Sequence, residues 1–418
     1  FREKRSIEAT VAWVLVLTTA PAIGCILYIA VGRGISKNNM FKIKEAEDKI
    51  LKENIIDTQI KLDRNDNFEP NLIGYKDMIY ALANSNNSHF TTNNDVEIFP
   101  EPNDFFESLL EELKKAKHHI NIQFYIFKDD EIGNKIIDIL IDKAQNGVEV
   151  RLLYDAVGSR LFSDKSIHKL KKSGVKVGAF FPSFMKVINF NLNYRNHRKI
   201  VVIDGNVGFI GGNNIGDEYL GKDPKFGYWR DTHLKITGDS VKDLNIRFIL
   251  DWRYTTKEDL VLDKYFGNET LRLSNSKACK DIGIQIVSSG PDSTELDEIK
   301  YGYIKMIQKA KKYIYIQTPY FILDKTLTDT LKIACFSGVD VRIMIPSKPD
   351  HPFVYWASSS YAGELLKYGA KLYNYDHNAF LHAKTIVVDD CVCSIGTANM
   401  DIRSFELNFE RKAWMYSS

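Results

Sequence analysis

The sequence predicts an α/β protein in which two similar domains follow an N-terminal transmembrane helix. Three observations lead to this prediction: a long uncharged segment near the start, two halves that repeat each other, and alternating helical and strand patterns within each half. Such alternation indicates a mainly parallel sheet with helices on its faces.

The composition is that of an ordinary folded protein, and 418 residues suffice for two domains after a membrane anchor. The formal net charge is +2, whereas a nucleic-acid-binding domain is usually clearly basic, so we expect no nucleic acid partner. The five cysteines are scattered, and the nine histidines lack the spacing of zinc ligands. We therefore expect reduced thiols, no metal and no cofactor.

The transmembrane helix is expected between Ala9 and Gly32, where "ATVAWVLVLTTAPAIGCILYIAVG" contains no charged residue. This length is enough to cross a bilayer, and the core of a cleaved signal peptide is usually shorter. Trp13 and Tyr28 lie towards the two ends, where aromatic residues favour the membrane surface. The larger basic cluster follows the span, which favours a cytoplasmic position for the rest of the chain.

These patterns divide the chain into four segments. Residues 1–33 hold the span and its flanks, 34–95 a juxtamembrane helix and linker, 96–275 the first domain and 276–418 the second. The chain starts at Phe1 rather than Met, so we expect residues to be missing ahead of the span.

The most informative repeat is "HRKIVVIDGNVGFIGGNN" (197–214), which returns as "HAKTIVVDDCVCSIGTAN" (382–399) with the same spacing of His, Lys, Asp, Gly and Asn. The first copy predicts a β-hairpin with "DGN" as its turn. Residues i and i+2 of a strand face the same side, so His197 and Lys199 should point into one space. A neutral nucleophile beside a fixed cation is suited to attack on a phosphate.

These paired motifs resemble those of the phospholipase D superfamily, and bacterial cardiolipin synthases most closely. The resemblance covers nearly the whole chain and includes "WRDTHLKITG" (229–238), "TPYFI" (318–322) and "NMDIRSFELNFE" (399–410). It implies two tandem phospholipase D-like α/β/α sandwich domains whose motifs line one active site. It also implies a C-terminal truncation, because bacterial cardiolipin synthases continue well beyond "NFERKAWMYSS".

Attack on a phosphodiester needs cations and fixed donors around the phosphoryl oxygens. Lys199 and Lys384 can supply the charges. One imidazole must be neutral to attack and the other protonated to release the alkoxide. The resemblance implies that His197 is the nucleophile, which forms a phosphatidyl-histidine. It makes His382 the general acid, and then the base for the incoming hydroxyl.

The remaining candidates are polar residues of the motifs and two nearby carboxylates. Asn214 and Asn399 can supply amide donors to the phosphate. Asp204 and Asp389 belong to the family motif and count as catalytic candidates, although a structural role in a turn is equally consistent with their spacing. A carboxylate should orient each imidazole. By family position, Asp231 and Glu410 are the candidates.

The resemblance implies a phosphatidyl transferase that joins two phosphatidylglycerol molecules into cardiolipin and glycerol, in a bacterial cell membrane with its catalytic domains facing the cytoplasm. Phosphatidylglycerol and membrane lipids would be its partners. The motifs do not distinguish a lipid alcohol from water, so a phospholipase D and a phosphatidylserine synthase remain alternatives. A nuclease would need a basic groove with stacking aromatic residues. A non-enzymatic scaffold would have degenerate motifs, and both motifs are complete.

Overall fold

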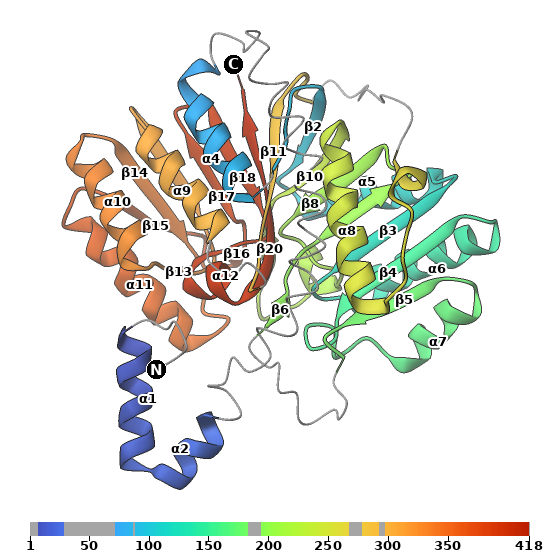
Figure 1. Cartoon of the computed structure of the whole chain (residues 1–418), viewed down its shortest axis with the longest axis horizontal. Helices are drawn as coiled ribbons and strands as arrows, with labels where there is room; N and C mark the ends of the chain where they lie inside the picture. The colour runs from blue at the N-terminus through green and yellow to red at the C-terminus, as the bar shows by residue number, and fades with distance from the viewer. Residues whose placement is uncertain are drawn as a thin grey trace.

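The computed structural model describes residues 7–28, 72–86, 88–182, 194–266, 278–291 and 297–417. Two β-sheets lie side by side in the middle of the molecule, each covered by helices (Figure 1). The prediction of two tandem α/β domains is confirmed. The expected helix that follows the N-terminal span, in residues 34–71, lies outside the described residues.

The first sheet has the strand order β2-β10-β8-β7-β3-β4-β5. Its strands are β2 (Asn94–Phe99), β3 (His119–Phe124), β4 (Glu149–Asp155), β5 (Lys176–Phe180), β7 (Ile200–Ile203), β8 (Val207–Gly211) and β10 (His233–Gly238). Its helices are α5 (Pro102–Lys115), α6 (Glu131–Gln145), α7 (Asp164–Lys172) and α8 (Ser240–Thr256). The apolar faces of α5, α6 and α7 form one core with the sheet, in which Leu109, Ile136 and Leu170 are buried.

The second sheet repeats this order as β11-β20-β18-β17-β12-β14-β15 and adds β1 (Phe90–Thr91) at its edge. Its strands are β11 (Gly283–Ser289), β12 (Tyr313–Gln317), β14 (Asp340–Ile345), β15 (Lys371–Asn374), β17 (Thr385–Val388), β18 (Val392–Gly396) and β20 (Asn408–Tyr416). Its helices are α9 (Glu298–Lys309), α10 (Lys325–Phe336), α11 (Pro352–Leu366) and the short α12 (Ile402–Glu406). The matching order confirms the internal repeat.

Both sheets are mixed, so the expectation of mainly parallel sheets is wrong. In the first, β3 and β4 and then β4 and β5 are parallel, whereas the pairings on the other side of β3 are antiparallel. The reason is local. The β7–β8 hairpin is joined by a short turn that can only make antiparallel neighbours, while the parallel strands are linked through helices. The hairpin itself, with its turn at Asp204, agrees with the prediction.

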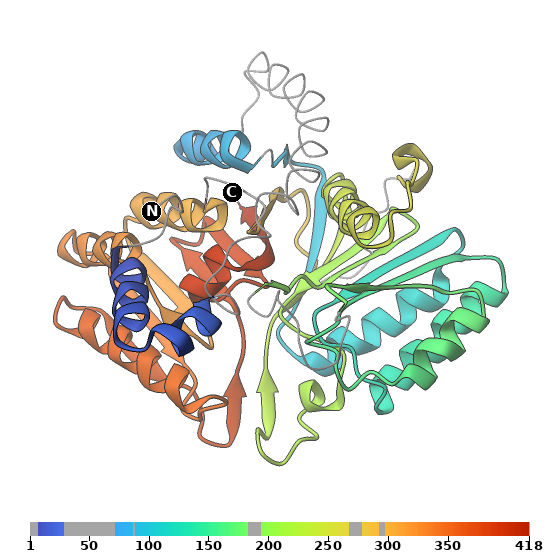
Figure 2. The same ribbon diagram turned by 60° about the horizontal axis from the view of Figure 1, so that its bottom comes forward.

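Residues 72–91 pack against the second domain. Helix α4 (Lys76–Asn86) lies beside α9 and β11, and Met78, Leu82 and Phe90 are buried in the core of the second sheet. The segment that precedes the first domain in sequence therefore completes the second domain in space (Figure 2).

The two sheets meet across a shared apolar core. It contains Val202 and Ile236 from the first sheet together with Ile286 and Met415 from the second, all nearly inaccessible to solvent. Two short parallel strand pairs also join the domains: β6 (Arg195–Asn196) with β20, and β9 (Tyr228–Arg230) with β16 (Ala379–Leu381). A further pair, β13 (Phe321–Ile322) with β19 (Met400–Asp401), lies within the second domain.

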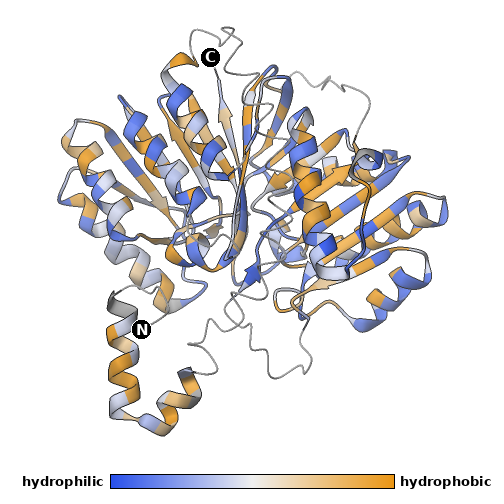
Figure 3. Cartoon of the chain, viewed as in Figure 1, coloured by the Kyte–Doolittle hydropathy of each residue, from blue (hydrophilic) through white to orange (hydrophobic). Residues whose placement is uncertain are grey.

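The N-terminal segment forms two helices instead of the single span expected between residues 9 and 32. Helix α1 (Ile7–Thr19) ends just before Pro21, which begins α2 (Pro21–Leu27) and leaves no amide hydrogen to continue α1. The rings of Trp13 and Tyr28 meet edge to face, 5.2 Å apart, so the two helices fold against each other. Both are largely apolar (Figure 3). Within the described ranges, no helix is long and apolar enough to cross a membrane.

Candidate active site

The two His-x-Lys segments lie where the domains are joined. His197 to Lys199 connects β6 to β7, and His382 to Lys384 connects β16 to β17. The histidines thus precede the hairpin strands. The sequence analysis had expected His197 and Lys199 on the strand itself, and that expectation is wrong. The backbone amide of His197 donates to Phe409 O at 2.9 Å, and that of His382 to Arg230 O at 2.7 Å. Each motif is therefore attached to the opposite domain by its own backbone.

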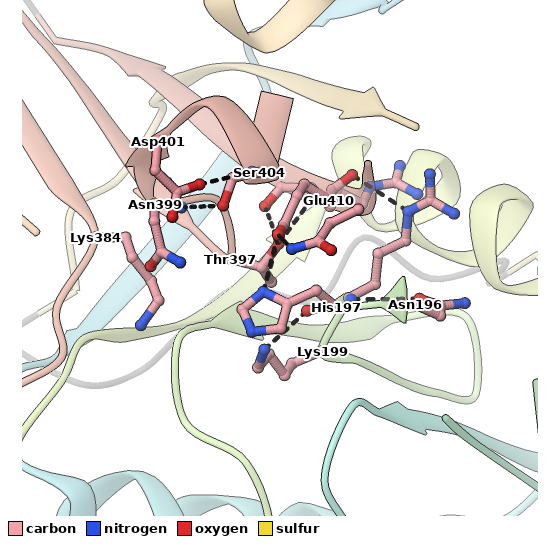
Figure 4. Close-up of polar contacts among 12 residues, drawn as sticks. Asn196, His197, Lys199, Lys384, Thr397, Asn399, Asp401, Ser404 and Glu410 are labelled. Atoms are coloured by element: carbon pink, nitrogen blue, oxygen red, sulfur yellow. Dashed lines mark hydrogen bonds and ion pairs between the residues drawn. The ribbon is translucent and has the colours of Figure 1, made fainter. Parts of the chain in front are cut away.

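Each imidazole is paired with a carboxylate from the other domain. Nδ1 of His197 lies 3.0 Å from the carboxylate of Glu410, on β20 (Figure 4). Nδ1 of His382 lies 2.6 Å from Oδ2 of Asp231, which follows β9. The structure therefore brings both predicted carboxylates to the imidazoles, and each His–carboxylate pair crosses the domain interface. With Nδ1 engaged in this way, Nε2 of each ring is left for chemistry.

The carboxylates are themselves held by neighbours that the sequence analysis did not identify. Glu410 accepts hydrogen bonds from the hydroxyl of Thr397 and from Asn408 Nδ2 at 3.1 Å. Asp231 accepts one from the backbone amide of Thr232 at 2.7 Å. Gly212 occupies the position in the first repeat that Thr397 has in the second, and a Cβ there would lie 2.0 Å from Oδ1 of Asp231. The replacement of Gly212 by Thr397 between the two repeats was the only sign in the sequence that these positions contact the carboxylates.

Three buried lysines provide the positive charge of the site. Lys199 Nζ donates to the carbonyl of His197 at 2.8 Å, and Lys384 Nζ donates to that of His382 and lies 3.7 Å from Asp231. Lys412, which the sequence analysis missed, donates to the carbonyl of Lys384 at 2.7 Å. Burial lowers the pKa of all three, to about 7 for Lys199 and Lys412 and about 8 for Lys384.

The same burial affects the histidines and their carboxylates. Burial lowers the pKa of His197, against the opposing effect of Glu410, and lowers that of His382 to about 4, helped by the charge of Lys384. Burial alone would raise the pKa of the carboxylates. For Glu410 the contact with His197 and the charge of Lys199 outweigh burial, and for Asp231 the charge of Lys384 and the contact with His382 do so, and the pKa of each carboxylate falls to about 2. The carboxylates are thus ionised beside two imidazoles that are neutral at pH 7.

Aromatic rings flank the two imidazoles. The ring of Tyr125 lies 4.8 Å from that of His197, and its centroid is 5.4 Å from Lys199 Nζ. The ring of Trp229 lies 5.0 Å from that of His382 and 4.9 Å from that of Phe380. These rings restrict each imidazole from the side, so its orientation depends on packing as well as on the carboxylate.

The structure does not place Asp204 and Asp389 with the other candidates. Asp204 accepts hydrogen bonds from the amides of Lys117, His118 and His119 at 2.7 to 2.9 Å, at the far end of its strand from His197. Asp389 binds the matching amides of the second repeat. Both adopt the left-handed conformation, with φ of 53° and 54°. Their position corresponds to the structural role in a turn, because a strand separates each from its histidine.

The two asparagines differ in their surroundings. In Asn214, Oδ1 accepts from the amide of Ile126 at 3.1 Å and Nδ2 donates to the hydroxyl of Tyr219 at 3.0 Å. Its amide therefore links the loop after β8 to Ile126 and Tyr219. The side chain of Asn399 lies beside Lys384 in Figure 4, and its Oδ1 has no hydrogen-bond partner in the described part of the chain. Among those same residues, no His, Cys, Asp and Glu side chains are grouped as metal ligands would be.

Comparisons with known proteins agree with this geometry. Residues 109–224 and 303–418 each match the family described as cardiolipin synthase, PLD-like domain. The chain belongs to this family. The two matches cover the two domains that carry the motifs. Residues 1–33 match a further family, described as phospholipase D-nuclease N-terminal.

Several curated members of the cardiolipin synthase family are similar over the whole chain. A cardiolipin synthase of Oceanobacillus iheyensis is 48 % identical, with 100 % of this chain and 86 % of the relative covered. The major cardiolipin synthase of Bacillus subtilis is 49 % identical, with 100 % and 85 % covered. One from Staphylococcus aureus is also 49 % identical, with 100 % and 83 % covered.

Among solved structures, a phosphatidylserine synthase of Haemophilus influenzae superimposes with a TM-score of 0.61 at 19 % identity, covering 81 % of this chain and 86 % of that one. At this identity the likeness shows a common fold, and it leaves the acceptor of this chain to be argued from other observations.

Proposed function

We propose that this chain is a cardiolipin synthase that transfers a phosphatidyl group from one phosphatidylglycerol to a hydroxyl of another, releasing glycerol. The observation that carries the proposal is the pair of crossed His–carboxylate contacts, one imidazole from each domain, among buried lysines. Membership of the cardiolipin synthase family, at close to half identity over the full chain, supports the lipid substrate and the lipid acceptor.

In the first step, Nε2 of His197 attacks the phosphorus of phosphatidylglycerol. The phosphorus–oxygen bond to the glycerol head group breaks, and the leaving alkoxide takes a proton from Nε2 of His382. Glu410 receives the hydrogen bond of Nδ1 of His197 and stabilises the positive charge that develops on the ring. Lys199 and Lys384 stabilise the charge on the phosphoryl oxygens. The product is a phosphatidyl-histidine and free glycerol.

In the second step, a hydroxyl of another phosphatidylglycerol loses its proton to His382 and attacks the same phosphorus. The bond to His197 breaks, which releases cardiolipin and restores both histidines. The two steps are mirror images, so the reaction is reversible. His382 has a pKa of about 4 in the free site. The negative phosphodiester raises that pKa when it binds, so His382 takes up from solvent the proton that it donates in the first step.

We further propose that the N-terminal segment holds the enzyme at the cell membrane, with the catalytic domains on the cytoplasmic side. The exposed apolar side chains of α1 and α2, which include Val14, Leu15 and Ile23, support an association with lipid. Removal of residues 1–33 is expected to shift the protein from the membrane pellet to the supernatant on cell fractionation. Full retention in the pellet would contradict this assignment.

The boundaries of the two catalytic domains, 96–275 and 276–418, are proposed on the internal repeat.

The test of the function is a product analysis. Purified enzyme in mixed micelles is incubated with phosphatidylglycerol as the only phospholipid, beside a His197→Ala variant. Cardiolipin and glycerol in equal amounts, absent with the variant, are the expected result. Phosphatidic acid in place of cardiolipin would mean that water takes the phosphatidyl group, and the synthase assignment would give way to a hydrolase.

A further inference from the structure

The two motifs differ at the residue between His and Lys. It is Arg198 in the first motif and Ala383 in the second. Arg198 is about 1 % exposed, and its guanidinium forms a bidentate ion pair with Asp251 on α8, with Nη1 2.9 and 2.8 Å from the two carboxylate oxygens. Asp251 is fully buried. A small apolar residue cannot form such a pair, so the second motif has no equivalent contact.

The rest of the guanidinium binds the backbone of the second domain. Nε donates to the carbonyl of Glu410 at 3.2 Å, and Nη2 donates to that of Ser289 at 3.1 Å. Ser289 and Glu410 are opposite each other in the β11–β20 ladder. One rigid fork, anchored by Asp251 in the first domain, therefore fixes two neighbouring strands of the second domain at the residue that contacts His197.

The anchor is itself braced from the first domain. Asp251 also accepts hydrogen bonds from Gln123 Nε2 at 3.0 Å and from Asn196 Nδ2 at 3.3 Å. Asn196 is the residue before His197. Both residues of the His197–Glu410 pair are thus connected to the carboxylate of Asp251. His197 is connected through its chain neighbour Asn196, and Glu410 through the guanidinium of Arg198.

We propose that Arg198 is a positioning residue, which with Asp251 sets the separation of His197 and Glu410 across the domain interface. This inference rests on the proposed function. In the His382–Asp231 pair, Arg230 Nη1 donates to the carbonyl of Asp231 at 2.6 Å, but both of these residues lie in the first domain, so this arginine does not link the domains. The β9–β16 strand pair links them there. The arginine that links the domains therefore lies at the imidazole to which bond formation with phosphorus is assigned, where misplacement of about 1 Å can lower the rate by roughly 10²-fold.

The test is a double-mutant cycle between the clamp and Glu410. Removing one partner would leave an unpaired buried charge and endanger folding. The clamp is therefore deleted as Arg198→Met with Asp251→Asn, which removes one charge of each sign. The amide oxygen of the new side chain remains as an acceptor for Arg247, whose Nε lies 3.7 Å from Asp251. Folding is checked by the thermal transition, and turnover is measured as exchange of labelled glycerol into phosphatidylglycerol, which needs no lipid acceptor.

The clamp deletion is expected to lower kcat by roughly 10- to 100-fold with KM changed by less than about 3-fold. In a Glu410→Gln background the same deletion should lower kcat by less than about 3-fold, because the contact that it positions is already lost. Arg198→Lys, which keeps the charge and loses the fork, should lower kcat as the deletion does. Full, multiplied losses in the combined variant, or full rescue by lysine, would overturn the inference.

A matched control removes a buried ion pair that lies away from both histidines. Lys235 and Glu112 are 2.8 Å apart, and their side chains are 11 % and 13 % exposed. Lys235→Met with Glu112→Leu should change kcat by less than about 2-fold in either background. A wild-type enzyme that exchanges no glycerol would refute the proposed function itself. Exchange that the clamp deletion does not slow would refute only the role of Arg198.

Discussion

The four acidic candidate residues fall into two pairs with different structural roles. Glu410 and Asp231 contact the imidazoles, whereas Asp204 and Asp389 each hold three backbone amides at the start of a neighbouring strand. The sequence spacing places Asp204 seven residues from His197. It cannot show whether the intervening strand brings the two together or separates them. The amides that Asp204 binds come from a segment more than eighty residues away, where no local pattern points to it.

We predict that Asp204→Ala destabilises the fold without impairing the chemistry. Loss of the carboxylate leaves three amides without their acceptor, which should lower the free energy of unfolding by about 1–3 kcal/mol. Turnover per folded molecule should stay within about 3-fold, while Glu410→Gln should lower kcat by roughly 10²- to 10⁴-fold, as expected of a carboxylate that orients a catalytic imidazole. Denaturant titration and kcat measured on the same preparations compare the two. Equal losses of kcat would contradict the division of roles.

The depressed pKa values predict that substrate binding takes up protons. Lys199 has a pKa of about 7 and Lys384 of about 8, so at pH 7.5 a fraction of the two is uncharged in the free site. A bound phosphodiester favours the charged forms, raises these pKa values and draws protons from solution.

Calorimetric titration measures this uptake. A short-chain phosphatidylglycerol would be added to the inactive His197→Asn variant in two buffers of different ionisation enthalpy. Lys199 and Lys384 together are expected to take up about one proton per site at pH 7.5, and His382, which becomes protonated beside the bound phosphodiester, up to about one more. Below pH 6 only the uptake by His382 should remain, because the lysines of the free site are already charged. Binding without any proton uptake across this range would contradict both the depressed pKa values of the lysines and the protonation of His382 on substrate binding.

At the scale of elements, the repeat and its hairpins could be predicted, and the connections between domains could not. The β7–β8 and β17–β18 hairpins carry long apolar runs with a clear turn. The strands that join the domains, β6, β9 and β16, are two or three residues long, too short for any periodicity to appear in the sequence. They hold the histidines just outside the hairpins, which is why the expectation of His and Lys on the strand itself was wrong.

The loop after β8 makes a prediction about one glycine. A Cβ at Gly212 would lie 2.0 Å from Oδ1 of Asp231, so Gly212→Ala should displace that carboxylate from His382. We expect kcat to fall by roughly 10²-fold, since misplacement of about an ångström has effects of this size.

Gly363→Ala on α11 is the matched control, because a Cβ at Gly363 would meet no atom within 4 Å. Alanine favours a helix over glycine by about 1 kcal/mol, so this variant should be as active as the wild type and no less stable. Steady-state measurements of kcat for both variants test this prediction. Normal activity in Gly212→Ala would mean that Asp231 can orient His382 from another position.

At the scale of the whole molecule, the site exists only because the two domains face each other. Each histidine receives its carboxylate from the other domain, and a continuous apolar core behind the site keeps the sheets in register. The family resemblance predicted one shared site and indicated Asp231 and Glu410 as the two carboxylates. Which carboxylate meets which imidazole, and the clamp at Arg198, depend on the packing of residues more than fifty positions apart. No spacing in a single sequence shows such contacts.

The apolar segment near the N-terminus shows that hydropathy alone does not predict whether a segment forms one helix or two. The uncharged segment is long enough to cross a bilayer, yet Pro21 divides it into two short helices. Length and composition indicate that the segment prefers an apolar environment, whereas Pro21 determines where the first helix ends.

The central claim is that His197 alone forms the covalent bond and His382 moves the proton. The full chain would be mixed with phosphatidylglycerol, quenched during turnover in denaturant at high pH, digested and analysed by mass spectrometry, because His382 must be present to protonate the leaving glycerol. The account predicts a phosphatidyl adduct on the peptide that contains His197, and no adduct in the His197→Ala variant. An adduct on His382 in either protein, or turnover of the full chain without any adduct on His197, would contradict it.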